Sequence, residues 1–131
     1  MASVLRFAAV FAAGVISGGA GIAALHAAEA QTAPAWVVAN IASVHDQAMY
    51  DKYRAGVTAT QTPFGGKVVA RTKAVKLDES TPPEGNVLLI KFPSMKALQS
   101  WWNSPAYAAI KPLRENATKS VEYALEGLPP S

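Results

Sequence analysis

The feature of this sequence that most constrains its fold is a pair of predicted strands that are apolar on both faces. Residues 35–44 and 87–92 are rich in β-branched and aromatic side chains, which is typical of strands. Successive side chains of a strand point to opposite faces of its sheet, so a sheet with one face in water alternates apolar and polar residues. These two segments do not alternate. We therefore expect both faces of the sheet to be covered.

The order of the predicted elements is β-α-β-β-α-β. Apolar residues at helical spacing follow Asp46 and Ser94, two residue types that cap helix N-termini. The strands are expected at residues 35–44, 67–77, 87–92 and 120–127. This order predicts an α+β, ferredoxin-like subunit: an antiparallel sheet with two helices on one face. Since the helices cover only one face, a second copy of the chain is the expected cover for the other, which predicts a homodimer.

A short helical turn is predicted between the second helix and the last strand. Pro105 is placed to begin it, because proline is favoured at the first position of a helix. Pro112 is expected to limit it, because a proline inside a helix removes a backbone hydrogen bond.

The first 30 residues are interpreted as a signal peptide. Arg6 precedes an apolar run over residues 7–25, and Ala28-Glu29-Ala30 is typical of a signal-peptidase site with cleavage after Ala30. An uncleaved membrane anchor is the alternative, since the run approaches the roughly 20 residues that span a bilayer. Under either interpretation the rest of the chain lies outside the cytoplasm, and the expected location is periplasmic or secreted. The expected organisation is a signal peptide over 1–30, a flexible lead-in over 31–35, the folded domain over 36–127 and a tail over 128–131.

The composition argues against several classes of function. The chain has no cysteine, so neither disulfides nor a thiolate metal site is expected. His45 is the only histidine after the leader, and we expect no metal and no cofactor. The net charge is only +3 and the basic residues are scattered, which argues against nucleic-acid binding. Contact with a membrane is expected only if the leader stays uncleaved.

Three segments resemble a known family. "DQAMYDKY" (46–53), "FGGKVVAR" (64–71) and "FPSMKALQSWWNSPAYAAIKPLR" (92–114) are similar to the Domain of Unknown Function 1330 family, within the dimeric α+β barrel superfamily. The resemblance spans nearly all of residues 36–127. It implies a ferredoxin-like subunit that pairs into a barrel, with a small cavity between sheet and helices. It implies no particular reaction, because the family has no established common activity.

The chain departs from the family pattern at two positions. Lys91 stands where the family usually carries an acid just before the Phe-Pro-Ser run, and Asn86 stands where a basic residue often opens that strand. Any chemistry that depends on the acid elsewhere in the family is therefore in doubt for this chain.

A small group of residues forms the candidate site. His45, Tyr53 and Tyr107 are the candidates for moving protons, and His45 has the reference pKa closest to neutrality. The alternative for His45 is an exposed position at the start of a helix. Trp101 is expected in the core, while Trp102 and Tyr107 are candidates for the border of a pocket, because each has a polar atom that needs a partner when buried.

A mixed polar set is expected on the sheet face away from the helices. Counting by twos along the strands places Asn40, Arg71, Lys91 and Glu122 there among apolar neighbours. A buried charge needs a partner, so the basic residues should meet either Glu122 or an anionic or carbonyl-bearing ligand. The candidate ligand-binding residues are thus Asn40, Arg71, Lys91, Trp102 and Tyr107.

Three functions remain open on the sequence alone. The first is binding of a small anionic or aromatic molecule. The second is a cofactor-free enzyme that acts on such a molecule by proton transfer, with Arg71 holding developing negative charge. The third is a structural module that associates only with itself.

Overall fold

The computed structural model describes residues 32–131, and the predicted signal peptide, its cleavage after Ala30 and the alternative membrane anchor lie outside these residues. Residues Ala33–Pro129 form one compact unit. Its elements are β1 (Ala35–Val44), α2 (Gln47–Gln61), the 3-10 helix η1 (Thr62–Phe64), β2 (Lys67–Lys73), β3 (Asn86–Phe92), α3 (Met95–Trp102), α4 (Pro105–Ala117) and β4 (Thr118–Glu126). None of the helices described in residues 32–131 is both long and apolar enough to cross a membrane.

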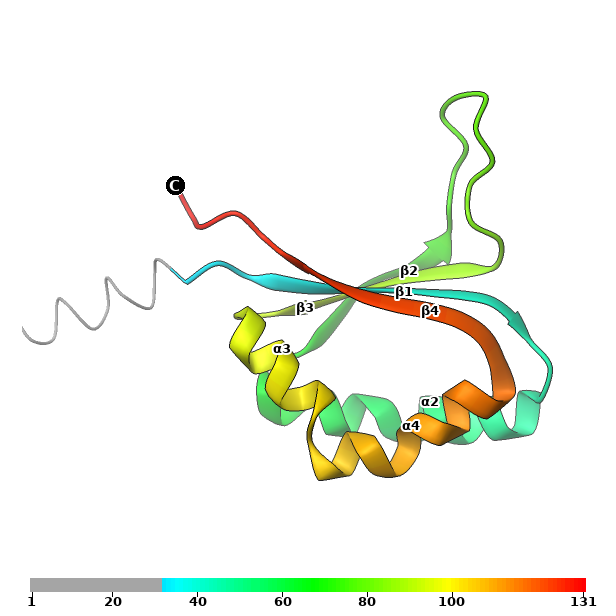
Figure 1. Ribbon diagram of the computed structural model, residues 1–131, viewed down its shortest axis with the longest axis horizontal. Coiled ribbons are helices and arrows are strands. Elements are labelled where there is room, and N and C mark those ends of the chain that lie inside the picture. Colours follow the sequence, from blue (N-terminus) through cyan, green and yellow to red (C-terminus); the bar gives the residue numbers. More distant parts are fainter. Residues whose placement is uncertain (1–31) are drawn as a thin grey trace, which may run out of the picture. The chain divides into compact units, whose positions relative to one another are not determined.

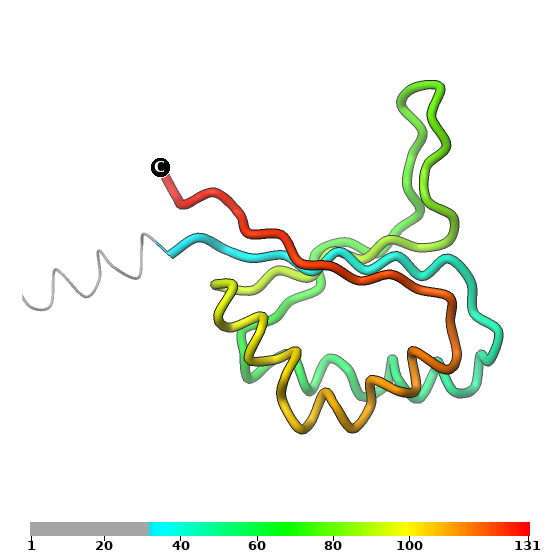
Figure 2. Tube along the Cα trace, viewed as in Figure 1, coloured from blue at the N-terminus to red at the C-terminus, as the bar shows by residue number. Residues whose placement is uncertain are grey.

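The structure confirms the predicted α+β, ferredoxin-like fold. Four strands form one sheet in the order β2-β3-β1-β4. The central strand β1 pairs antiparallel with β3 and with β4, and β2 pairs antiparallel with β3. The helices lie together on one side of this sheet (Figure 1). The first and last strands of the domain run side by side, as the trace in Figure 2 shows.

Each described α-helix begins after a residue whose side chain caps it. Asp46 Oδ1 accepts a hydrogen bond from the Met49 amide at 3.0 Å, and Ser94 Oγ accepts one from the Ala97 amide at 3.1 Å. Ser104 does the same for α4. A side-chain cap of this kind contributes about 1 kcal/mol. The two capping residues predicted from the sequence, Asp46 and Ser94, are confirmed.

The core lies between the sheet and the helices. Alternate residues of β1 are buried, and Phe92 and Ile90 of β3 continue the same layer. Trp101 is 1% exposed and its ring lies 5.3 Å from that of Phe92. Its indole Nε1 donates to Thr60 Oγ1 at 3.0 Å, which satisfies the polar atom of this buried ring. The structure thus places Trp101 in the core, as the sequence predicted.

The prediction that Pro112 limits the helix beginning at Pro105 is wrong. Helix α4 continues to Ala117, with Pro112 inside it. Both Pro112 and Ala108 are exposed, so the Ala108 carbonyl that loses its helical donor lies where water can replace that donor. Burial of Arg114 and Ala117 beyond the proline holds the last turn against the protein. Strand β2 also differs from its prediction, since it ends at Lys73.

The sheet face away from the helices is apolar and only partly shielded. Side chains that the pairing places on this face, among them Trp36 and Val38, are half-buried. Others are substantially exposed: Val121 (61%), Tyr123 (52%) and Leu125 (52%). No helix of the described residues lies against this side in Figure 1. The sequence predicts that both faces of the sheet are covered. Within the described part of the chain, no element covers the face away from the helices.

The long connection between β2 and β3 projects from the domain. We call residues 74–85 the arm; it rises on the side of the sheet opposite the helices (Figure 1). Val75 and Leu77 on this arm are 79% and 96% exposed. The arm thus places two large apolar side chains in solvent on the same side as the uncovered sheet face.

Gly85, at the base of the arm, provides a test of the fold. Its φ is +72°, and a Cβ there would overlap the Ile41 carbonyl oxygen. Gly85→Ala should therefore destabilise the protein by about 2 kcal/mol or more, because the backbones of β1 and the arm must separate. Gly56→Ala is the matched control, since its Cβ would meet only Ile110 Cγ2 at 3.9 Å. Urea unfolding measures both, and equal midpoints would contradict this close approach.

Candidate functional site

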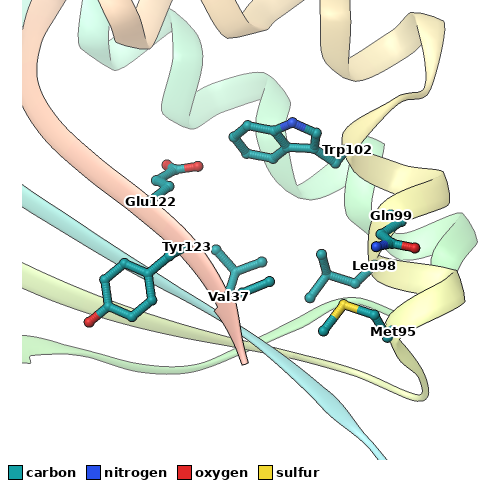
Figure 3. Close-up of a pocket in the computed structure, with 8 residues that line it drawn as sticks. Val37, Met95, Leu98, Gln99, Trp102, Glu122 and Tyr123 are labelled. Carbon is teal, nitrogen blue, oxygen red and sulfur yellow. The ribbon is translucent and has the colours of Figure 1, made fainter. Parts of the chain in front are cut away.

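A cavity of about 300 Å³ lies between α3 and the strands β1 and β4. Most of its wall is apolar, and Figure 3 shows Met95 and Leu98 on one side facing Val37 and β4 on the other. The lining residues are Val37, Met95, Leu98, Gln99, Trp102, Glu122, Tyr123 and Ala124. A concave, mainly apolar space with few polar groups is typical of a small-molecule site.

The residues of α3 that line the pocket follow from helical spacing. Met95, Leu98 and Trp102 recur three and then four positions apart, which places them on one stripe of the helix. Trp102 is offset from Trp101 by one position, so it is half-buried at the edge of the core while Trp101 is central. The sequence therefore predicted correctly that Trp102 borders a pocket.

Neighbouring side chains hold the Trp102 ring in place. The ring centroid lies 5.8 Å from that of Trp101 and 5.2 Å from that of Tyr107. Lys111 Nζ lies 4.4 Å from the Trp102 ring, which is a cation–π contact. An aromatic wall fixed in this way can stack on a flat ligand without first losing much conformational freedom.

The charged group on the pocket wall is Glu122 of β4, which is paired with Arg114 of α4. Arg114 Nε lies 3.0 Å from Glu122 Oε1, and each side chain is only 6% exposed. Arg114 Nη1 also donates to Ser120 Oγ at 2.9 Å. Arg114 Nε and Glu122 Oε2 are both buried without a hydrogen-bond partner, so the 3.0 Å contact is an ion pair rather than a well-aligned hydrogen bond.

Burial dominates the electrostatics of Glu122. Loss of water raises the pKa of its carboxyl, and the positive charge of Arg114 only partly opposes this change. The carboxyl is thus easier to protonate than an ordinary glutamate. Within residues 32–131, no group of three or more histidine, cysteine or acidic side chains is arranged to hold a metal ion.

Two tyrosines lie in the interior next to this ion pair. The hydroxyl oxygens of Tyr53 and Tyr107 are 3.3 Å apart, and the Arg114 guanidinium carbon lies 6.0 Å from the Tyr53 ring centroid. Burial raises the pKa of both phenols, so each keeps its proton near neutral pH. Tyr107 is fully buried, and neither tyrosine is among the residues that line the pocket. Tyr107 packs against the Trp102 ring of the pocket, and Tyr53 contacts Tyr107. The proposed role of both tyrosines in proton transfer stays a prediction.

The predicted polar set is not assembled on one face, and its placement was partly wrong. Arg71 lies opposite Leu88 and Glu122 lies opposite Ala39, which puts both on the helix-facing side. A bulge between Val68 and Ala70 shifts the alternation of β2, so counting by twos failed there. Glu122 was misplaced because the more apolar face of β4 turns away from the helices. Its partner is Arg114 and not Arg71 or Lys91.

Asn40 and Lys91 do lie on the face away from the helices, and each has a partner within the protein. Asn40 Nδ2 donates to the Glu84 carbonyl at 2.8 Å, which ties β1 to the arm. Lys91 Nζ lies 5.5 Å from the Trp36 ring. Neither residue lines the pocket described above. Their predicted role in ligand binding stays a prediction.

His45 is exposed, as one of the two interpretations of the sequence expected. Its Nε2 lies 2.8 Å from the Asn116 carbonyl oxygen, which joins the start of α2 to the end of α4. It does not line the pocket. The sequence missed Arg114 altogether, because the helix was expected to end near Pro112. A helix allowed to continue through that proline would have placed Arg114 one turn from its end, beside β4.

The raised pKa of Glu122 predicts a specific pH dependence. Below about pH 4.3, the ordinary value for glutamate, the residue is protonated in both folded and unfolded states. As the pH rises, Glu122 ionises first in the unfolded chain, which stabilises the unfolded state. The free energy of unfolding of the wild type therefore falls until the pH has passed the raised pKa of Glu122 in the folded state. A tenfold difference in proton affinity between the two states corresponds to about 1.4 kcal/mol of stability.

Glu122→Gln lacks this titration and serves as the reference. The wild-type free energy of unfolding should therefore fall relative to that of Glu122→Gln as the pH rises from about 4 through the raised folded pKa. Urea unfolding at closely spaced pH values measures the difference in free energy of unfolding between the two proteins. The contributions of the other carboxyl groups are the same in both proteins and cancel in this difference. A difference that stays constant or grows with pH would show that Glu122 is not destabilised by burial.

Comparison with solved structures supports the fold. A protein of unknown function from Rhodopseudomonas palustris is 20% identical with a TM-score of 0.60, over 75% of this chain and 85% of that one. A dimeric ferredoxin-like protein of unknown function from Thermobifida fusca is 9% identical with a TM-score of 0.51, over 73% and 92%. SnoaB, a cofactor-independent oxygenase from Streptomyces nogalater, is 15% identical with a TM-score of 0.50, over 72% and 91%. At these identities the likeness shows the fold alone.

Comparison of the sequence itself gives the family. No curated protein matches the chain. Residues 34–128 match a family described as a domain of unknown function, DUF1330. This match covers nearly the whole described domain, including both walls of the pocket and the Arg114–Glu122 pair. The chain therefore belongs to the DUF1330 family.

Proposed function

We propose that this protein is an exported homodimer that binds a small, uncharged aromatic molecule between α3 and β4. The observation that carries the proposal is the cavity of about 300 Å³ with an apolar wall and the fixed Trp102 ring at its border. Pockets for small organic molecules commonly measure about 300–1,000 Å³. This cavity therefore suits a ligand of one or two rings.

The charge of the wall favours an uncharged ligand over an anion. Among the described residues that line the cavity, Glu122 is the only charged one, and its buried carboxylate repels an anion. The basic residues that suggested an anion lie elsewhere: Arg71 is exposed, and Lys91 is on the opposite face of the sheet. Of the two ligand classes expected from the sequence, anionic and aromatic molecules, the aromatic class has the better support.

The homodimer is supported by the uncovered sheet face. Val121, Tyr123 and Leu125 of the edge strand β4 are more than half exposed on that face. Apolar surface of this kind is stabilised when a partner removes it from water. A second copy with the same surface supplies such a cover by two-fold symmetry. The Thermobifida fusca protein of similar fold is described as dimeric, which adds support.

The arm fits the same association. It rises on the side where the second copy would lie, and it carries the exposed side chains Val75 and Leu77 (Figure 1). It also carries three acids, Asp78, Glu79 and Glu84, whereas the sheet face carries Lys67 and Lys91 directly opposite each other. Two like charges in register are unfavourable, and acids from a partner's arm would offset them.

Export is proposed on the sequence alone. The charged start, the apolar run and Ala28-Glu29-Ala30 are the support for a cleaved signal peptide.

The dimer is tested by charging the sheet face. Val121→Lys combined with Leu125→Lys should convert a dimer to a monomer in analytical ultracentrifugation, since two-fold symmetry would bury four added like charges. Ala108→Lys, on the exposed side of α4, is the matched control and should leave the dimer intact. A wild-type protein that sediments as a monomer at high concentration would overturn the proposal.

The pocket is tested by filling it. Ala124→Phe places a ring in the cavity from β4, while Ala106→Phe adds the same ring at an exposed position of α4 outside it. Equilibrium dialysis with 1-methylindole should show binding to the wild type and to Ala106→Phe, and at least about ten-fold weaker binding to Ala124→Phe. Equal binding to all three proteins would place the probe elsewhere. Absence of binding of both 1-methylindole and indole to the wild type would favour a purely structural module.

A further inference from the structure

We infer that Glu122 is the hydrogen-bond acceptor for the ligand, and that the ligand is an uncharged aromatic molecule carrying an N–H or O–H donor. This inference rests on the proposed binding function and narrows its ligand class. It is carried by an acceptor that the folded chain leaves unsatisfied on the wall of the pocket.

The unsatisfied acceptor is Glu122 Oε2. Its companion oxygen, Oε1, lies 3.0 Å from Arg114 Nε, whereas Oε2 has no hydrogen-bond partner although it is buried. Buried polar groups are nearly always hydrogen-bonded, so an exception calls for an explanation. The nearby tyrosine hydroxyls are 3.3 Å apart and in contact with each other. No donor of the described residues meets the geometry of a hydrogen bond to this oxygen, although the Tyr107 hydroxyl is near enough to the carboxyl to lower its pKa.

The position of the carboxylate makes a ligand the natural donor. Glu122 lines the cavity, and Figure 3 shows its carboxylate directed toward Trp102 across the pocket. The last torsion of a glutamate side chain is broad, so a small rotation can present an oxygen to the cavity. A ring stacked on Trp102 would then bring a donor at its edge to this carboxylate. Gln99, the uncharged polar side chain on the wall, is exposed and less suited to fix a ligand.

The charge balance selects the type of donor. Arg114 already neutralises Glu122 within a pair whose side chains are each 6% exposed. An uncharged donor satisfies the remaining oxygen and leaves this balance intact. A cation would leave a net charge beside this buried pair, and an anion would lie against the carboxylate. An indole N–H, a phenol O–H or an aromatic alcohol has the required chemistry.

The test compares two probes that differ only in the donor. Indole carries the N–H, and 1-methylindole replaces it with a methyl group on the same ring system. A hydrogen bond to a charged acceptor predicts that the wild type binds indole about ten-fold or more tightly than 1-methylindole in equilibrium dialysis. This preference should disappear in Glu122→Met, which keeps the side-chain length and removes the acceptor.

A second variant protects the test against misfolding. Glu122→Met leaves Arg114 unpaired, whereas Arg114→Met combined with Glu122→Met replaces the whole pair by apolar side chains, a change that proteins often tolerate. In the double variant both probes should bind with equal affinity. A double variant that still prefers indole would overturn the role of Glu122.

The remaining outcomes separate this inference from the proposed function. Equal binding of both probes to the wild type would leave the pocket standing and overturn the role of Glu122. Tighter binding of indole-3-carboxylate than of indole would show that Arg114 rather than Glu122 selects the ligand, and would also overturn it. Failure of both neutral probes to bind the wild type would overturn the binding function together with the inference.

Discussion

The ion pair between Arg114 and Glu122 joins the last helix to the last strand inside the protein, and it sets the charged part of the pocket wall. The two side chains are each 6% exposed, and α4 must continue past Pro112 for Arg114 to reach β4. Such a pair gains little net stability, because the cost of removing two charges from water offsets most of their attraction. Loss of one partner is far more damaging, since it leaves a buried charge alone. The pair therefore fixes where α4 meets β4 more than it stabilises the fold.

The pocket combines this polar group with aromatic walls. Trp101, Trp102 and Tyr107 form one aromatic cluster, in which the Trp101 and Tyr107 centroids are 4.2 Å apart. Trp101 and Tyr107 are buried and hold the helices to the sheet, while Trp102 has one side toward the cavity. The two adjacent tryptophans thus have different roles, which follow from a rotation of about 100° between neighbouring positions of a helix.

Much of the fold could be predicted from the sequence, because it depends on local patterns. β-Branched runs predicted β1 and β3, and the caps Asp46 and Ser94 predicted where α2 and α3 begin. The apolar character of both sheet faces also proved correct, since Val121 and Tyr123 lie exposed on the face without helices. Only part of the site could be predicted. Trp102 follows from helical spacing, but the Arg114–Glu122 pair depends on strand register and on a helix that tolerates a proline, and neither is a local property.

The measurement that tests the binding site most directly is an NMR titration in which the tryptophan side chains report on the ligand. The three tryptophans of the chain occupy three different environments: Trp36 is half-buried on the sheet face away from the helices, Trp101 is in the core, and Trp102 lines the pocket. Titration of ¹⁵N-labelled protein with indole should shift the indole N–H signal of Trp102 most, shift that of its neighbour Trp101 less, and leave that of Trp36 unchanged. A Trp102 signal that stays fixed, or a shift largest at Trp36, would contradict a ligand site between α3 and β4.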